Sequence, residues 1–170
     1  AHQLELCTDY AKVFAFAPNS SRGMRSVTLS MGLTGFYNRI TDKIVALPKG
    51  NTQFRWSMMN IGKVEDKGCE AKAGVTLALP KQVELALNGS YTYQRAQDKS
   101  DPTDITYNGQ IAYIPEHSGS VLVRLTWQGL TFNYAFTYVG ERYTGSVNSK
   151  KHPLDAWSTH DVCVGYTWQF

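Results

Sequence analysis

The last stretch of the chain, residues 160–170, reads HDVCVGYTWQF, and the rest of the sequence is best interpreted outward from it. Taken two at a time, its residues separate into a small or polar set and an apolar, aromatic set. This period of two is typical of a β-strand with one apolar face. Terminal residues usually fray in water unless something docks them, so the aromatic end predicts a strand held in a sheet. The apolar set is Val162, Val164, Tyr166, Trp168 and Phe170.

The same alternation occurs in six further stretches. These expected strands are about 10 to 14 residues long, which exceeds the usual 5 or 6 in soluble sheets. No helical period lies between them. The sequence therefore predicts an all-β protein with seven antiparallel strands. The six stretches are about residues 4–16, 27–40, 65–79, 82–95, 117–128 and 130–139.

The connections between these strands are unequal in length. Short turns are expected at residues 17–26, 80–81 and 128–129, and loops of about 20 residues at 42–63, 96–116 and 140–159. Because consecutive turns of an up-and-down sheet lie at opposite ends, all the short turns share one rim. Short periplasmic turns and long extracellular loops are typical of an outer-membrane β-barrel. We therefore expect a transmembrane barrel with its long loops outside and the final strand running down to the periplasmic face.

The composition is compatible with a membrane β-barrel and argues against a helical membrane protein and a nucleic-acid-binding protein. No stretch of the 170 residues approaches the roughly 18 to 20 consecutive apolar residues of a membrane-spanning helix. The net charge of +3 is spread along the chain, so nucleic-acid binding has little support. The three cysteines have no metal-ligand spacing, and we expect free thiols. Strand parity predicts that Cys7 and Cys163 face inward and Cys69 outward.

The odd number of strands has a consequence for domain organisation. Single-chain bacterial barrels normally close with an even number of strands, and an open sheet would expose unpaired edge groups to lipid. We therefore expect residues 1–170 to be the carboxy-terminal part of a larger barrel, whose missing strands come from elsewhere.

Several segments resemble TonB-dependent outer-membrane receptors. The segment 36–70, FYNRITDKIVALPKGNTQFRWSMMNIGKVEDKGCE, is similar to the late-barrel pattern of that family. YIPEHSGSVLV (residues 113–123) and TYVGERY (137–143) resemble the strand pair before the family's last loop, and GYTWQF (165–170) its assembly signal. The matching positions of the first segment are Tyr37, Asp42, Ile44, Asn60, Gly62, Gly68 and Glu70.

The resemblance implies a fold and a function. The fold is the last seven strands of a barrel of about 22, whose plug domain and earlier strands lie outside this sequence. The function is import of a scarce nutrient (cobalamin, haem or a ferric siderophore) across the bacterial outer membrane, without catalysis or a resident cofactor. The implied partners are the plug, the remaining barrel, outer-membrane lipid, TonB acting through the plug, and a surface lipoprotein. The sequence of residues 37–70 most resembles that of receptors of the Bacteroides group, including ones assigned to cobalamin.

The barrel insertion machinery is a further implied partner. It would read the assembly signal, whose key residues here are Gly165, Trp168 and Phe170.

Candidate ligand-binding residues lie in the three expected long loops. An aromatic ring beside an arginine can stack on a flat ligand or neutralise an acidic one. The alternative is that such aromatics belong to the interfacial girdle of the barrel. The candidates are Arg55, Trp56 and Met58 in the first loop, Tyr107 and Asn108 in the second, and Arg142 and Tyr143 in the third.

Other chemistry has weaker support. His117, His152 and His160 are scattered without a metal-binding spacing, and no nucleophile elbow surrounds Ser158 and Asp161. Two other architectures stay open. An eight-stranded outer-membrane barrel with a structural or adhesion role would need a further strand within residues 42–63. A soluble lipocalin-like carrier would turn the apolar face inward. Side chains expected to face the lumen include Glu70, Lys72, Glu84 and Arg124.

Overall fold

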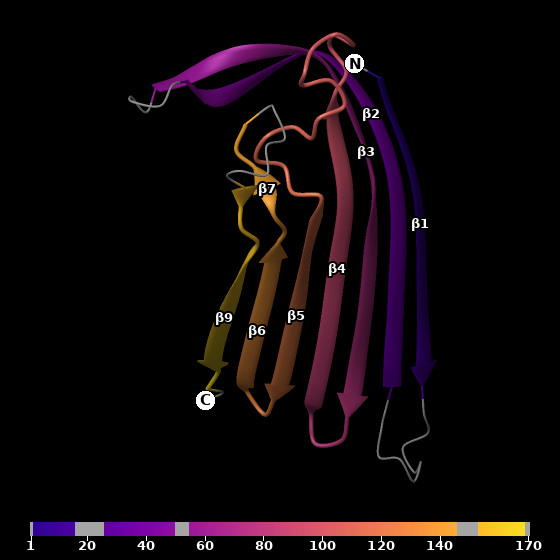
Figure 1. Cartoon of the computed structure of the whole chain (residues 1–170). Coiled ribbons are helices and arrows are strands. Elements are labelled where there is room, and N and C mark those ends of the chain that lie inside the picture. Colours follow the sequence, from indigo (N-terminus) through magenta and orange to yellow (C-terminus); the bar gives the residue numbers. More distant parts are fainter. Residues whose placement is uncertain (1, 16–25, 50–54, 146–152, 169–170) are drawn as a thin grey trace.

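The computed structural model describes residues 2–15, 26–49, 55–145 and 153–168 as one curved antiparallel sheet with loops at one end (Figure 1). Within these residues, no helix is long and apolar enough to cross a membrane. The sheet has seven strands, and β7 and β8 form a separate two-stranded ribbon. The sheet strands, in spatial order, are β1 (His2–Ala15), β2 (Ser26–Lys49), β3 (Arg55–Leu79), β4 (Val83–Asp98), β5 (His117–Trp127), β6 (Leu130–Val139) and β9 (Trp157–Tyr166); the ribbon is β7 (Arg142–Tyr143) and β8 (Pro153–Leu154).

The alternating sequence pattern predicted this sheet correctly. Seven antiparallel strands follow one another in chain order, and β6 has the predicted bounds. The other strands begin or end within a few residues of the predictions, apart from the loop ends of β2 and β3. Residue 16 and residue 170, at the ends of two predicted strands, lie outside the described residues. The predicted short turn at residues 17–26 also falls almost wholly outside them.

The prediction of a long loop at residues 42–63 was wrong. Pairing of β2 with β3 continues through this stretch, from Thr41↔Lys63 to Lys49↔Arg55. Asp42 has a φ of 58° and interrupts the ladder, which resumes at Lys43↔Ile61. The apolar residues of this stretch, such as Ile44, Val45 and Trp56, are good strand formers. The two strands therefore stay paired as a two-stranded ribbon. In Figure 1 this ribbon turns away from the strand direction of the sheet.

The two other long connections lie where they were predicted, between β4 and β5 and between β6 and β9. The second connection is shorter than expected, because β4 continues to Asp98 before the chain returns at His117. The third connection contains the β7–β8 ribbon between β6 and β9. All three therefore emerge from the same end of the sheet, opposite the short turns.

The turn between β5 and β6 shows how the chain reverses within two residues at the rim of short turns. Gln128 and Gly129 form a two-residue loop between the paired residues Trp127 and Leu130, with φ values of 44° and 88°. Two positive φ angles match the twist of the flanking strands, and glycine adopts this geometry readily. Gly129 also lies close to the carbonyl of Thr167, because a Cβ there would stand 2.7 Å from that oxygen.

The register sorts the side chains into two faces. One cross-strand row contains Tyr10, Met31, Ala73, Gly89 and Val121, and the adjacent row contains Ala11, Ser30, Gly74, Asn88 and Leu122. Rows of the first kind are mostly apolar and form what we call the apolar face. Rows of the second kind are small or polar and form the polar face.

The polar face lies on the inner side of the curved sheet. On β2, residues of the apolar face from Met31 to Arg39 are exposed, whereas the residues between them are half-buried. Such crowding is expected where side chains converge inside a barrel. The cysteines follow the same rule: Cys7 and Cys163 lie on the polar face, Cys69 lies on the apolar face, and all three are free.

The sheet is open. β1 and β9 are its two edges, and the described residues form no pairing between them. Side chains of both strands are exposed on both faces, as expected for strands that lack a neighbour on one side. The residues that would have supplied an eighth strand instead extend β2 and β3.

Candidate functional site

The polar face carries a series of hydrogen bonds between neighbouring strands. The Ser90 and Ser120 hydroxyls are 2.8 Å apart, and the Arg124 Nε donates to Asn133 Oδ1 at 2.9 Å. Lys72 Nζ lies 3.2 Å from Glu70 Oε1. This ion pair is largely exposed, so it stabilises the sheet little in itself. Lys72, Ser90 and Ser120 line a hollow of about 660 Å³, together with Asp9, Ser30 and Asn88.

The structure thus places the predicted luminal residues together. Glu70, Lys72, Glu84 and Arg124 all share the polar face. Asp66 was not among the predicted residues, and its carboxylate accepts two hydrogen bonds from Gln94 Nε2 at 3.1 Å. Strand parity could have identified this pair, because Asp66 has the same parity as Glu70.

At the loop end, the connection between β4 and β5 folds back on the sheet. Ile111 N donates to Ala96 O at 2.8 Å, and Gln94 N donates to Glu116 O at 2.9 Å. Ile111 packs with the fully buried Val64 and Ala96, and Ile114 packs against this cluster. The buried apolar residues of the described chain are Val64, Ala96, Ile111 and Ala112. The connection is therefore a fixed cap that can present side chains in a defined arrangement.

Two aspartates shape the outer half of this connection. Asp101 Oδ1 accepts hydrogen bonds from the Thr103 amide at 2.9 Å and from its hydroxyl at 2.7 Å. Asp104 Oδ1 accepts a hydrogen bond from the Thr106 amide at 3.1 Å. Such bonds satisfy backbone groups in tight turns. The backbone N–H of Thr103, followed by its hydroxyl, lowers the pKa of the Asp101 carboxyl below 3.8.

The lowered pKa predicts how the Asp101 turn responds to acid. A carboxyl whose pKa is lower in the folded state contributes its full stability above the unfolded-state pKa and loses it as the pH falls through the folded-state pKa. We expect the connection to resist cleavage at neutral pH and to become more sensitive as the pH falls through the lowered folded-state pKa of Asp101. Pepsin digestion between about pH 5 and pH 2 would measure this. Asp101→Ala should be cleaved faster than the wild type near pH 5, and equal cleavage of both proteins at that pH would contradict the expectation.

Tyr107 and Asn108 lie side by side on this connection. Lys99 Nζ lies 5.5 Å from the centroid of the Tyr107 ring and also contacts Asn108 Oδ1. Gln97 Nε2 donates to Asn108 O at 2.7 Å, and Asn108 has a φ of 64°. Lys99 thus contacts both predicted residues. A ligand that binds Tyr107 and Asn108 would also meet the Lys99 ammonium group, which was not among the predicted residues.

Arg142 and Tyr143 form β7, and Tyr143 contacts the same connection. Tyr113 N donates to Tyr143 O at 2.8 Å, which links the second and third connections. The Arg142 Nε is buried and has no hydrogen-bond partner among the described residues. Beside this link lies a cavity of about 340 Å³, lined by Glu116, His117, Tyr138, Gly140, Glu141, Tyr143 and Ala156.

The first group of predicted residues lies apart from the others, on the β2–β3 ribbon. Trp56 pairs with Pro48, and Arg55 pairs with Lys49 at the end of the ladder. Met58 is 75% exposed. The side chains of Arg55 and Trp56 lie outside the described part of the structure. The base of this ribbon contacts the second connection, because Lys99 N donates to Lys63 O at 2.8 Å.

The residue types of a hydrolytic triad are separated by the sheet. His160 lies on the apolar face, where its Nδ1 is 2.8 Å from the Tyr134 hydroxyl, whereas Asp161 lies on the polar face. His117 similarly lies 2.7 Å from the Tyr91 hydroxyl, and His152 falls outside the described residues. In the described chain, no three His, Cys, Asp or Glu side chains group to hold a metal ion.

The assembly-signal residues lie on and after the last strand. Gly165 is part of β9, and Trp168 follows it with 74% of its surface exposed. The Tyr166 and Trp168 rings meet edge to face, with centroids 5.0 Å apart. Phe170 lies outside the described residues.

Comparison with known proteins agrees with the geometry. The family model for "TonB dependent receptor-like, beta-barrel" matches residues 23–170. No curated protein matches the chain. Proteins of this family are receptors and transporters of the bacterial outer membrane, not enzymes, and act with a plug domain and TonB. An antiparallel sheet with a polar inner face and unequal rims is the architecture that this match requires. The chain belongs to the TonB-dependent receptor β-barrel family.

Proposed function

We propose that this chain supplies the last seven strands of a receptor that imports a scarce nutrient: cobalamin, haem or a ferric siderophore. The observation that carries the proposal is the asymmetry of the sheet. One face is apolar, the other is polar and crowded, and all long connections leave from one rim. In a plugged barrel the polar face meets the plug, and the connections form the mouth. Further strands would pair with the free edges of β1 and β9.

We further propose that the long connections face the cell exterior and that the carboxy-terminus faces the periplasm. This orientation follows from the usual arrangement of short periplasmic turns and long extracellular loops. It also places the end of β9 where the barrel insertion machinery would meet it. A surface lipoprotein would approach the nutrient from the same side as the connections.

Two architectures that the sequence left open have less support. An eight-stranded adhesion barrel needs another strand in the sheet, and residues 42–63 extend β2 and β3 instead. A lipocalin-like carrier needs its apolar face inward, whereas the polar face is the more crowded one. The combined surface of Tyr107, Asn108, Arg142 and Tyr143 is then the strongest candidate for the nutrient-binding mouth, because the Tyr113–Tyr143 hydrogen bond connects its two parts.

Cysteine labelling tests the orientation. In the receptor with its native cysteines replaced by serine, Asp104→Cys should react with a membrane-impermeant maleimide on intact cells. Lys81→Cys, in the opposite turn, should react only after the outer membrane is opened. Both positions are exposed, so the comparison reports the side of the membrane and not local burial. Labelling of Lys81→Cys alone on intact cells would reverse the proposed orientation.

Nutrient uptake tests the mouth. A strain lacking the receptor should grow on one of the three nutrients only when the full receptor is restored. Tyr143→Ala is expected to lower uptake about tenfold, because tyrosine is enriched among the few residues whose truncation costs a binding site more than about 1 kcal/mol. Lys81→Ala is the control and should support normal uptake. Normal uptake of all three nutrients without the receptor would reject the proposed substrates.

A further inference from the structure

Charged side chains on the apolar face are confined to its two ends. Lys12 lies near the rim of short turns, where its Nζ stands 4.8 Å from the centroid of the Phe14 ring. Near the rim of long connections lie Arg39, Lys63, Glu65, Lys67 and Arg95. Along the described sheet between these ends, the apolar face carries no lysine, arginine, aspartate or glutamate.

The charges near the long connections are mostly basic, and the single carboxylate among them, Glu65, compensates them only in part. Lys67 and Arg95 are directly opposite each other on β3 and β4, an arrangement that is destabilising for like charges unless an anion intervenes. Glu65 is the carboxylate among them, and it lies 3.5 Å from Lys67 and accepts a hydrogen bond from the Tyr37 hydroxyl at 3.1 Å. Within the described chain, Arg39 and Arg95 form no ion pair with a carboxylate. We call Arg39, Lys67 and Arg95 the basic rim.

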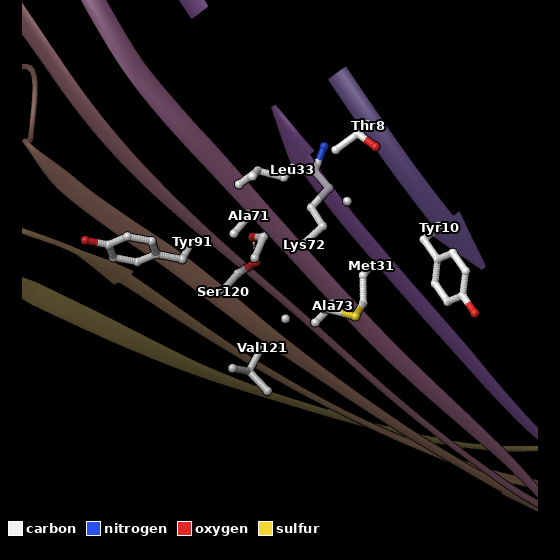
Figure 2. A pocket seen from close by; sticks show the side chains of 13 residues that line it. Thr8, Tyr10, Met31, Leu33, Ala71, Lys72, Ala73, Tyr91, Ser120 and Val121 are labelled. Atoms are coloured by element: carbon white, nitrogen blue, oxygen red, sulfur yellow. Dashed lines mark hydrogen bonds between the residues drawn. The ribbon is translucent and has the colours of Figure 1, made fainter. Parts of the chain in front are cut away.

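An apolar groove leads toward the basic rim on the same face. Its larger part, of about 640 Å³, has Tyr10 and Met31 on one side, Tyr91 and Val121 on the other, and Ala71 and Ala73 between them (Figure 2). A second part, of about 450 Å³, shares Thr8 and Leu33 with the first and extends to Gly35 and Cys69. Gly35 and Cys69 each stand two residues from the row that contains Tyr37 and Lys67. We call the two parts together the outer groove.

We propose that the basic rim and the outer groove bind one anionic lipid of the outer leaflet, with its phosphate at the rim and an acyl chain in the groove. Basic side chains close to a membrane surface attract anionic headgroups, and an apolar depression below them suits a hydrocarbon tail. A second copy of the chain does not fit this surface. A two-fold interface centred on the basic rim would bring two copies of these mostly basic side chains together.

The proposal rests on the proposed placement of the apolar face against lipid and of the long connections outside. It is independent of which nutrient the receptor carries. Free phosphate would occupy the basic rim alone, so involvement of the outer groove distinguishes a lipid from a free anion.

Native mass spectrometry of the full receptor tests the proposal. The receptor would be extracted from its own outer membrane in mild detergent, and the phosphorylated lipid retained per receptor counted. We expect lipid on the wild-type receptor and about a fivefold loss for each neutralised charge, hence about 25-fold for the double variant Arg39→Gln/Arg95→Gln. Lys12→Gln, on the same face at the far rim, should retain lipid normally. Heat-modifiable gel mobility would confirm that each variant is folded.

A second variant tests the groove without changing charge. Ala71→Leu places a larger side chain on the groove floor and should lower lipid retention several-fold. Equal lipid retention in the double variant and in Lys12→Gln would overturn the proposal. Displacement of the bound species by inorganic phosphate, or recovery of a protein subunit in place of lipid, would overturn it as well. Failure of nutrient uptake with normal lipid retention would reject the nutrient proposal alone.

Discussion

Val121→Arg is expected to lower sharply the amount of folded receptor in the outer membrane. Val121 lies on the apolar face of β5, paired with Gly89 and Phe136. An arginine on the lipid face of a membrane barrel costs about 2–4 kcal/mol at the membrane midplane, because its charge loses water and gains no partner there. The measurement is the fraction of receptor with heat-modifiable gel mobility in isolated outer membranes.

Leu122→Arg is the matched control for this substitution. Leu122 is the next residue of the same strand and lies on the polar face, paired with Asn88 and Ala135. The two side chains are almost equally exposed, at 36% for Val121 and 38% for Leu122. They therefore differ mainly in the face that they occupy. A larger loss of folded receptor for Leu122→Arg than for Val121→Arg would show that the polar face, and not the apolar face, meets the lipid.

Gly68→Ala is expected to destabilise the barrel strongly although it adds one methyl group. A Cβ at Gly68 would stand 2.1 Å from the Tyr93 carbonyl oxygen and 2.7 Å from the Phe36 ring. The nearest atom belongs to the backbone of the adjacent strand, so relief requires β3 and β4 to move apart. Overpacking usually costs about 1–3 kcal/mol, and we expect the upper end of this range. The midpoint of urea unfolding of the receptor in detergent would measure the change.

Gly35→Ala provides the comparison for Gly68→Ala. Gly35 lies on β2, and a Cβ there would meet no atom within 4 Å. The same chemical change should therefore leave the unfolding midpoint nearly unaltered. If both substitutions lowered the midpoint equally, the loss would reflect the conformational preference of glycine in a strand and not the close approach of β4.

The strands and their faces could be predicted from sequence because both follow from a local period. In β6, aromatic residues such as Phe132 and Phe136 alternate with polar residues such as Asn133, and the observed bounds match the predicted ones. The same period placed Glu70 and Arg124 on the polar face. The ribbon at residues 42–63 was missed because Asp42, Pro48 and Gly50 are turn-forming residues. Pairing with the opposite strand outweighed these local preferences.

The candidate binding surface was only partly predictable. Tyr107, Asn108, Arg142 and Tyr143 were selected by residue type, but their connection through Tyr113 depends on how two loops fold against each other. Lys99 was missed because nothing in the local pattern indicates that its ammonium group contacts Asn108 and the Tyr107 ring. Contacts between residues in irregular loops depend on long-range packing and not on a sequence period.

The closing stretch HDVCVGYTWQF shows what each level of information determined. The sequence alone determined that Val162, Val164, Tyr166 and Trp168 share a face, because side chains alternate along any extended strand. Only the tertiary structure decided the register in which this strand pairs with β6, with Tyr166 opposite Leu130 and Val164 opposite Phe132, because a period of two fixes the face but not the offset between strands. Register also decided that Arg39, Lys67 and Arg95 meet on one face, because residues far apart in sequence become neighbours only across a ladder.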